Sequence, residues 1–142
     1  MVPELHEAGF AGIMGGMASA ATSIASCLIV DDHEKMRSLL RSLVGAGIPE
    51  IREAGNGAEG LDAFEEHRPD LVLMDIEMPV MDGISATREL VRRHPDAVVV
   101  VVTHHNDPAM HELALAAGAR AFLLKTKLSQ LPHLIRELQT EA

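Results

Sequence analysis

Four apolar segments of this chain end in side chains that could act together on one ligand. Asp31 and Asp32 close the first segment, Asp75 closes a second, and Thr103 and Lys125 close two more. Carboxylates are the ligands that hard divalent cations prefer, and a hydroxyl and an ammonium bind anionic oxygens. The residue types therefore indicate a metal-ion site, provided that the fold brings the four segment ends to one place.

The elements that would position these residues alternate regularly along the chain. Short apolar runs predict strands at residues 27–31, 50–54, 71–75, 97–103 and 121–125. Apolar residues at helical spacing predict helices through Met36 to Val44, through Leu61 and Phe64, over residues 84–94, from Pro108 to Gly118, and through Leu128 to Leu138. Strict alternation predicts an α/β fold, a doubly wound five-stranded parallel sheet with helices on both faces. We expect the flavodoxin-like strand order 2-1-3-4-5.

In such a sheet, ligands bind beyond the carboxyl ends of the strands, where the strand order reverses. The expected order places the first, third and fourth strands side by side, so Asp31, Asp32 and Asp75 would crowd together. Without a cation this cluster is electrostatically costly and raises the pKa of one carboxyl group. Mg²⁺ held by one or two carboxylates and water would relieve the repulsion. Any one of these residues could be a solvated loop side chain, but the combination favours a site.

The segments that carry these residues resemble a known family. LIVDD (28–32), LVLMDIEMPVMDG (71–83), VVVVVT (98–103) and GARAFLLK (118–125) are similar to the receiver domain of two-component response regulators. The resemblance runs from about Ser26 to the C-terminus, and its motifs are specific in combination. We therefore expect a receiver domain over residues 26–142.

The resemblance implies a role for each carboxylate. Asp75 would be the phosphoacceptor, Asp31 and Asp32 would help it to hold Mg²⁺, and the backbone carbonyl of Glu77 would complete the metal site. Carboxylate attack on phosphorus is an established covalent route, and phosphoryl transfer needs mainly positioning and charge neutralisation. The chemistry of the residues thus agrees with the family.

The resemblance also assigns the remaining strand ends. Thr103 and Lys125 would contact the phosphoryl group, and Phe122 matches the aromatic residue that turns inward as the Thr hydroxyl moves toward the phosphoryl group. A plain core phenylalanine is the alternative for Phe122. On phosphorylation the domain would present an altered face to a partner. This face would comprise the helix from Pro108 to Gly118, the strand that follows it, and the last helix.

Three positions near the expected site depart from the family or tune its chemistry. His104 follows Thr103 where the family usually has a small residue, so it would obstruct the incoming phosphodonor. His105 and Glu77 occupy positions that tune dephosphorylation in the family. His104, His105 and His111 could be read as a transition-metal site, but no carboxylate or cysteine at matching spacing supports one. We expect these histidines on a surface loop.

The composition narrows the classes of function. Apolar residues make up 47% of the 142 residues, with no Trp or Tyr and three Phe, which predicts an aliphatic core. Twelve Lys and Arg against 21 Asp and Glu give a formal net charge of −9. This acidity argues against nucleic acid as a direct partner, because phosphate contacts need a basic surface. The single cysteine, Cys27, excludes an internal disulfide, fits a reducing cytoplasm, and is expected to be a buried apolar residue.

The partners and activity follow from the resemblance. A sensor histidine kinase or phosphotransfer protein would supply the phosphoryl group, a downstream protein or output domain would receive the signal, and a phosphorylation-dependent homodimer is a further expectation. The chain would be a signalling domain rather than an enzyme, with at most self-phosphorylation from small donors and autodephosphorylation. Two alternatives stay open. One is an atypical receiver that acts through constitutive contacts, which His104 raises, and the other is a Mg²⁺-dependent phosphatase with an aspartyl nucleophile. The second lacks the D-x-D of haloacid-dehalogenase-like enzymes, since Asp31-Asp32-His33 does not match it.

The segment GNGAEG (55–60) spells the Gly-x-Gly-x-x-Gly of a dinucleotide-binding loop. It follows strand 50–54, which is an edge strand in the expected order and lacks an unbroken apolar run. Asn56-Gly57 is better interpreted as a turn that caps a helix beginning near Ala58. The motif is therefore interpreted as a coincidence of turn chemistry.

Residues 1–25 are predicted to form a flexible extension. The stretch from Ala8 to Val30 carries no charge and is long enough to suggest a transmembrane helix. Glycine, alanine and serine dilute its hydrophobicity, and it lacks the positive start of a secretory signal. We therefore expect no membrane role and a cytoplasmic location.

Overall fold

The computed structural model describes residues 23–140, and most of the predicted extension, residues 1–22, lies outside this range. The strands are β1 (Ser26–Val30), β2 (Glu50–Ala54), β3 (Leu71–Met74), β4 (Val99–Thr103) and β5 (Ala121–Leu124). The α-helices are α2 (Glu34–Val44), α3 (Gly57–His67), α4 (Gly83–Arg93), α5 (Pro108–Ala116) and α6 (Leu131–Thr140), with 3₁₀ turns η2 (Gly45–Gly47) and η3 (Lys125–Gln130). The five strands form one parallel sheet in the order β2-β1-β3-β4-β5. The predicted flavodoxin-like fold is confirmed.

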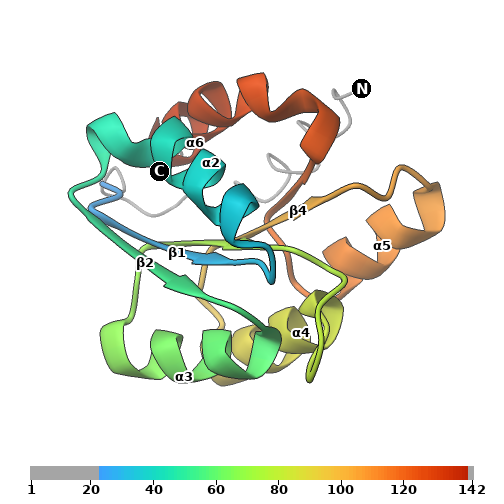
Figure 1. Cartoon of the computed structure of the whole chain (residues 1–142). Helices are drawn as coiled ribbons and strands as arrows, with labels where there is room; N and C mark the ends of the chain where they lie inside the picture. Colours follow the sequence, from blue (N-terminus) through green and yellow to red (C-terminus); the bar gives the residue numbers. More distant parts are fainter. Residues whose placement is uncertain (1–22, 141–142) are drawn as a thin grey trace.

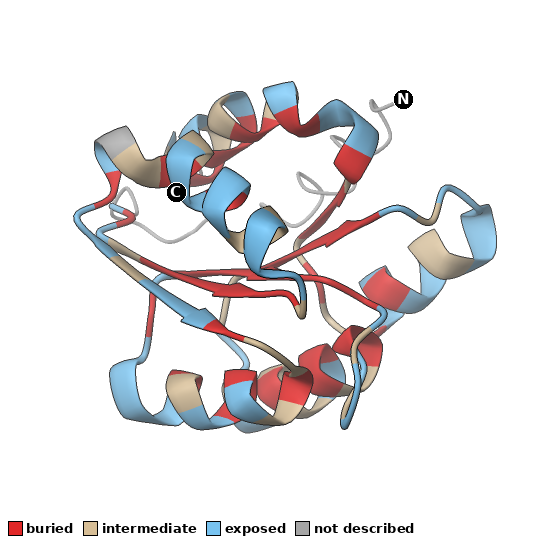
Figure 2. Cartoon of the chain, in the orientation of Figure 1, coloured by how far each residue is buried: buried red, intermediate tan, exposed pale blue. Residues whose placement is uncertain are grey.

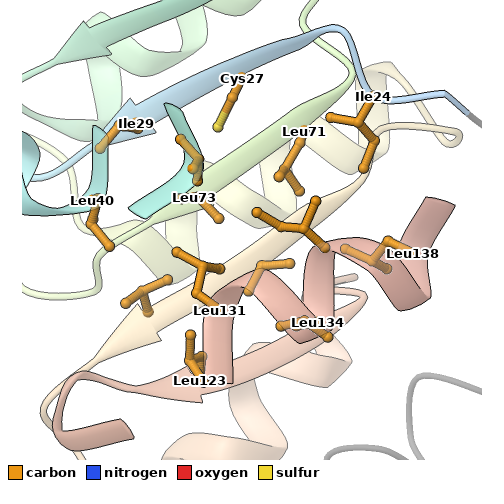
Figure 3. Close-up of a cluster of buried hydrophobic side chains, with 14 of the residues drawn as sticks. Ile24, Cys27, Ile29, Leu40, Leu71, Leu73, Leu123, Leu131, Leu134 and Leu138 are labelled. Atoms are coloured by element: carbon orange, nitrogen blue, oxygen red, sulfur yellow. The ribbon is translucent and has the colours of Figure 1, made fainter. Parts of the chain in front are cut away.

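Helices cover both faces of the sheet (Figure 1). On one face, α2 and α6 pack over a cluster that includes Ile29, Leu73 and Leu123, part of which Figure 3 shows. On the other face, α3 and α4 cover Leu28 and Val72 and their neighbours, and α5 extends that layer over β4 and β5. Because successive strand residues point to opposite faces, every residue of β3 and β4 is buried (Figure 2).

The core is aliphatic, as the composition predicts. Cys27 is buried within it at 1% exposure, and burial raises the pKa of its thiol to about 12 despite the nearby charge of Arg41. A thiol with this pKa stays protonated at neutral pH and behaves as a small apolar side chain. Cys27 therefore has the structural role that the sequence suggests.

The edge strand β2 differs from the central strands because charged side chains line it. Its residue Glu53 is exposed and accepts hydrogen bonds of 2.8 Å from Arg37 and from Arg41, both on α2. These bonds, reinforced by the charges of the two arginines, outweigh the effect of burial and lower the pKa of Glu53. The guanidinium of Arg41 also donates to the backbone carbonyl of Ile51 at 3.2 Å. Helix α2 is thus tied to the sheet edge by ion pairs.

Among residues 23–140, no helix has the length and apolar character needed to cross a lipid bilayer.

One backbone conformation in the loop between β3 and α4 is strained. Val80 has φ 68°, in the left-handed region that β-branched residues disfavour. Its neighbours close a tight turn around it, because the backbone N–H of Met81 donates to the carbonyl of Pro79 at 2.7 Å. Val80 is 82% exposed, so little packing offsets the strain.

We predict that Val80→Gly raises the free energy of unfolding by about 1 kcal/mol. Left-handed strain at a non-glycine residue costs about 1–3 kcal/mol, and the entropic cost of a glycine offsets about 0.5–1 kcal/mol of the relief. Urea unfolding of both proteins measures the difference. Val80→Ala is the matched control, since it removes the side chain but keeps the Cβ, and it should give no comparable gain.

Candidate functional site

The buried ammonium of Lys125 lies where the carboxyl ends of β1, β3 and β5 meet. Its Nζ donates to Oδ2 of Asp31 at 2.8 Å and lies 3.1 Å from Oδ1 of Asp75. Burial by itself would lower the pKa of Lys125, but the hydrogen bond to Asp31 and the two carboxylate charges outweigh it and raise that pKa. The lysine is therefore a fixed positive charge that holds two acids from different strands together.

Asp75 is placed beside Asp31 by the register of the sheet. Val30 pairs with Met74, and the backbone N–H of Asp75 donates to the carbonyl of Val30 at 2.9 Å. Only 6% of Asp75 is exposed. Burial, followed by the charge of Asp31, raises the pKa of Asp75, and Lys125 compensates for only part of this rise. Asp75 is thus a carboxylate whose ionisation the surrounding protein disfavours.

Asp32 and His33 complete the acidic end of β1. Asp32 Oδ1 is buried and accepts no hydrogen bond from any residue in 23–140, although Nδ1 of His33 lies 3.1 Å away. Nδ1 of His33 also lies 3.5 Å from Oδ1 of Asp31, which accepts the backbone N–H of His33 at 2.8 Å. In the described residues, Asp31, Asp32 and His33 form the group whose ligand atoms lie close enough to bind one ion. A buried carboxylate oxygen without a donor fits a hard divalent cation, so the Asp31 and Asp32 carboxylates suit Mg²⁺.

Thr103 ends β4 and is 1% exposed. Its Oγ1 accepts the backbone N–H of His105 at 3.1 Å, and Nε2 of His105 lies 2.8 Å from Oε2 of Glu77. This second contact joins the loop after β3 to the loop after β4. His104, between Thr103 and His105, is exposed. The predicted tuning residues Glu77 and His105 are therefore in contact with each other, and His104 lies next to them at the surface.

Phe122 points into the protein rather than into solvent. It is 2% exposed, and its ring packs edge to face with that of His111 on α5, with centroids 3.7 Å apart. His111 therefore lies on α5 and contacts the predicted switch residue, so the expectation that it stands on a surface loop is wrong.

The loop that follows Asp75, residues 75–82, is called the β3–α4 loop. The backbone N–H of Gly83 closes it by donating to the carbonyl of Ile76 at 2.8 Å, and a Cβ on Gly83 would collide with the carbonyl of Asp75. Asp82 then caps α4, because its side chain accepts the backbone N–H of Ser85 at 2.8 Å. The D-G pair at residues 82–83 thus combines a helix cap with a position where only glycine fits.

The GNGAEG segment serves the start of α3. Asn56 caps the helix by accepting the backbone N–H of Glu59 at 2.9 Å, and α3 begins at Gly57, one residue before the predicted start. Gly60 lets the helix approach β1, since a Cβ there would lie 3.1 Å from the methyl groups of Val30. Strand β2 lies at the edge of the sheet, as expected. The glycines therefore serve capping and helix–sheet packing, which accounts for the motif without a nucleotide.

Sequence reasoning missed two residues that shape the site. Arg37 donates to the backbone carbonyl of Asp31 at 2.8 Å, and His33 lies against both acids of β1. A basic residue one helical turn and a half after an acid pair has no distinctive pattern, so nothing in the spacing marks Arg37. His33 directly follows the two acids in the sequence, so its position could have indicated that its imidazole lies beside them.

The fold and this arrangement of acids, hydroxyl and ammonium define a signalling receiver. The chain belongs to the response regulator receiver domain family, which its sequence matches over residues 27–136. It is 42% identical over 100 residues to the uncharacterized transcriptional regulatory protein YhcZ of Bacillus subtilis, covering 69% of this chain and 47% of that protein. It is 40% identical over 99 residues to the chemotaxis protein CheY of Thermotoga maritima, covering 69% of this chain and 82% of that protein. The chain thus spans about half the length of the transcriptional regulator.

Solved structures agree. A LuxR-family DNA-binding response regulator from Staphylococcus aureus superposes with a TM-score of 0.75 at 27% identity, covering 82% of this chain and 100% of that one. CheY in the CheX–CheY–BeF₃–Mg²⁺ complex from Borrelia burgdorferi gives 0.72 at 28% identity, covering 80% and 86%. Receiver domains of two-component systems interact with histidine kinases and with downstream output domains. The predicted family is confirmed.

We predict that Asp75→Asn stabilises the fold at pH 7 in the absence of divalent cations. Folding raises the pKa of Asp75, so the folded state binds the proton of this carboxyl more tightly than the unfolded state does. The resulting stabilisation of the fold is complete below the unfolded-state pKa and is lost as the pH rises through the folded-state pKa. A neutral amide escapes this loss. The gain in melting temperature should therefore shrink as the pH falls toward about 4, near the pKa of an unperturbed Asp. Asp62→Asn, an exposed acid on α3, should show no such pattern.

Proposed function

We propose that this receiver accepts a phosphoryl group from a histidine kinase or phosphotransfer protein on Asp75, with Mg²⁺, and then presents an altered face to a partner. The observation that carries the proposal is the buried pairing of Lys125 with both Asp31 and Asp75. Asp75 directly follows β3, and Lys125 holds it beside the Asp31 carboxylate. Neither alternative is favoured, because the family match and the strand-end residues all point to a phosphoacceptor receiver.

Each residue has a definite part in the transfer. An oxygen of the ionised Asp75 carboxylate attacks phosphorus as the bond from phosphorus to the donor's imidazole nitrogen breaks, and the imidazole leaves with its electron pair. Lys125 neutralises charge on the phosphoryl oxygens, and the hydroxyl of Thr103 can donate to one of them while its oxygen accepts the His105 N–H. Asp31, Asp32, Asp75 and the carbonyl of Glu77 would hold Mg²⁺, which when bound offsets the charge of the acids and of the phosphoryl group.

The surroundings of Asp75 favour such a reaction. Burial and the charge of Asp31 raise the energy of its ionised form, so conversion of the carboxylate to an uncharged acyl linkage removes a charge from the crowded position. Phosphoryl oxygens then carry the negative charge farther out, beside Lys125. A site built in this way favours the covalent product more than a solvated carboxylate would.

The relatives support the same proposal. The Borrelia burgdorferi CheY structure contains Mg²⁺ and BeF₃, a phosphoryl mimic, together with CheX. Because YhcZ and the Staphylococcus aureus protein are a transcriptional regulator and a DNA-binding regulator by name, we propose that a DNA-binding output domain or protein receives the signal. The acidic receiver itself would not bind DNA. The face proposed to change comprises α5, β5 and α6, and Phe122 of β5 packs against His111 of α5.

We predict that acetyl phosphate with Mg²⁺ adds one phosphoryl group to the wild type and none to Asp75→Asn. The amide lacks the anionic oxygen that must attack phosphorus. Intact-mass spectrometry measures the adduct, and Asp62→Asn, which keeps every residue of the site, should be labelled like the wild type. Equal labelling of the Asp75→Asn protein would refute the assignment.

We predict that millimolar Mg²⁺ raises the melting temperature of the wild type. A ligand at one hundred times its Kd stabilises the native state by about 2.7 kcal/mol. The increase should be much smaller for Asp32→Ala, which lacks the buried oxygen without a donor. Thermal unfolding with and without the ion measures both effects. A wild type that does not respond to Mg²⁺ would contradict a metal site here.

A further inference from the structure

The second glycine of GNGAEG lies against the β3–α4 loop. The backbone N–H of Gly57 donates to the carbonyl of Met81 at 3.1 Å. Amide groups in the first turn of a helix have no acceptor within the helix, so the acceptor of such an N–H is a group outside the helix. That hydrogen bond fixes the outside group beside the start of the helix. Helix α3 therefore holds the loop that begins with Asp75.

No side chain fits at this contact. A Cβ on Gly57 would lie 2.5 Å from the carbonyl oxygen of Met81 and 3.0 Å from Cβ of Ala86 on α4. The nearer obstacle is backbone, which cannot rotate away as the end of a flexible side chain can. An L-residue at position 57 must therefore push the Met81 carbonyl out of place or lift α3 from the loop.

The other two glycines of the segment differ from Gly57. A Cβ on Gly55 would meet Oε1 of Glu59 at 3.4 Å, an ordinary contact with a flexible side chain, and one on Gly60 would meet Val30 in the core. Of the three, Gly57 is the one pressed against the β3–α4 loop.

The loop is thus fixed near both ends. Gly83 holds the carbonyl of Ile76, Gly57 holds the carbonyl of Met81, and Glu77 lies between these two points. The segment after Met81 cannot absorb a shift of the Met81 carbonyl, because Gly83 already fits tightly against the backbone of Asp75. Displacement would pass to Glu77, whose carbonyl is assigned above to the metal.

We propose that Gly57 is a positioning residue for phosphoryl transfer, which holds the β3–α4 loop in the conformation that binds Mg²⁺. The inference rests on the function proposed above. It gives the Gly-x-Gly-x-x-Gly segment a part in this receiver: its second glycine places the metal-binding loop by a backbone contact and touches no ligand.

The test compares Gly57→Ala with Gly118→Ala. Gly118 has φ 111°, and a Cβ there would lie 2.8 Å from Val91, so its substitution also strains the fold, but in the turn between α5 and β5, away from the strand ends of the site. Loss of a group that orients metal ligands lowers metal affinity about 10- to 100-fold. Calorimetric titration should show Mg²⁺ affinity reduced by at least tenfold in Gly57→Ala and unchanged within about twofold in Gly118→Ala. Urea unfolding establishes that both variants are folded during the titration.

Wild-type affinity in Gly57→Ala would overturn the inference, as would an equal loss in both variants. A wild type that binds no Mg²⁺ and takes no phosphoryl group refutes the proposed function itself, and the inference with it. If Gly57→Ala does not fold, amide exchange in the wild type decides. Mg²⁺ should slow exchange at the Gly57 amide and not at the Gly118 amide, which donates to Leu115 within another element. Equal exchange at Gly57 with and without the ion would overturn the inference.

Discussion

The placement of Lys125 between Asp31 and Asp75 is the interaction on which the site depends. Two carboxylates with almost no exposure could not share one edge of the sheet unless a cation lay between them, since each charge loses its hydration there. The lysine supplies that cation from the start of η3, directly after β5. It is held by two acids, so removal of either leaves the ammonium with one partner. The sheet order is a precondition, because it places β1 beside β3, and β5 two strands beyond β3, from where Lys125 still reaches both acids.

A parallel sheet buried on both faces makes this arrangement possible. The central strands carry apolar side chains on both sides, so polar residues are excluded from them until the strands end. At their carboxyl ends the chain leaves the sheet, and the first residue past the apolar run can be charged without disturbing either layer of helices. The functional residues thus gather at the carboxyl ends of the strands, and the amino ends carry connections such as the turn at Gly118.

Residues whose roles follow from strand ends could be predicted from the sequence. Asp31, Asp75, Thr103 and Lys125 each terminate an apolar run. Given the flavodoxin-like strand order that we expected for five alternating strands and helices, their convergence needs no knowledge of side-chain conformation. The cap at Asn56 is equally local. The strand predicted at residues 97–103 begins two residues later, at Val99, although the carbonyl of Val98 still accepts the backbone N–H of Val72 in β3.

Contacts between elements could not be predicted in this way. Nothing in the spacing shows that α3 starts against Met81, because that depends on how the helix lies relative to a loop more than twenty residues later. The same holds for His105 with Glu77 and for His111 with Phe122, which need the conformations of two loops and a helix. Leu39 shares the apolar spacing of its helix yet is 44% exposed, since α2 is covered on one side only and periodicity does not specify how wide that side is.

The ion pairs along β2 have a consequence for the molecule in a crowded solution. A strand with a neighbour on one side only presents backbone groups that can pair with a strand of another chain, which is a common route to aggregation. Here Glu53 is held by two arginines of α2, and the carbonyl of Ile51 already accepts a guanidinium. An approaching strand would have to displace these charged partners and strip water from them. The β2 edge of the sheet is therefore guarded against intermolecular β-pairing by charged groups that must first be displaced.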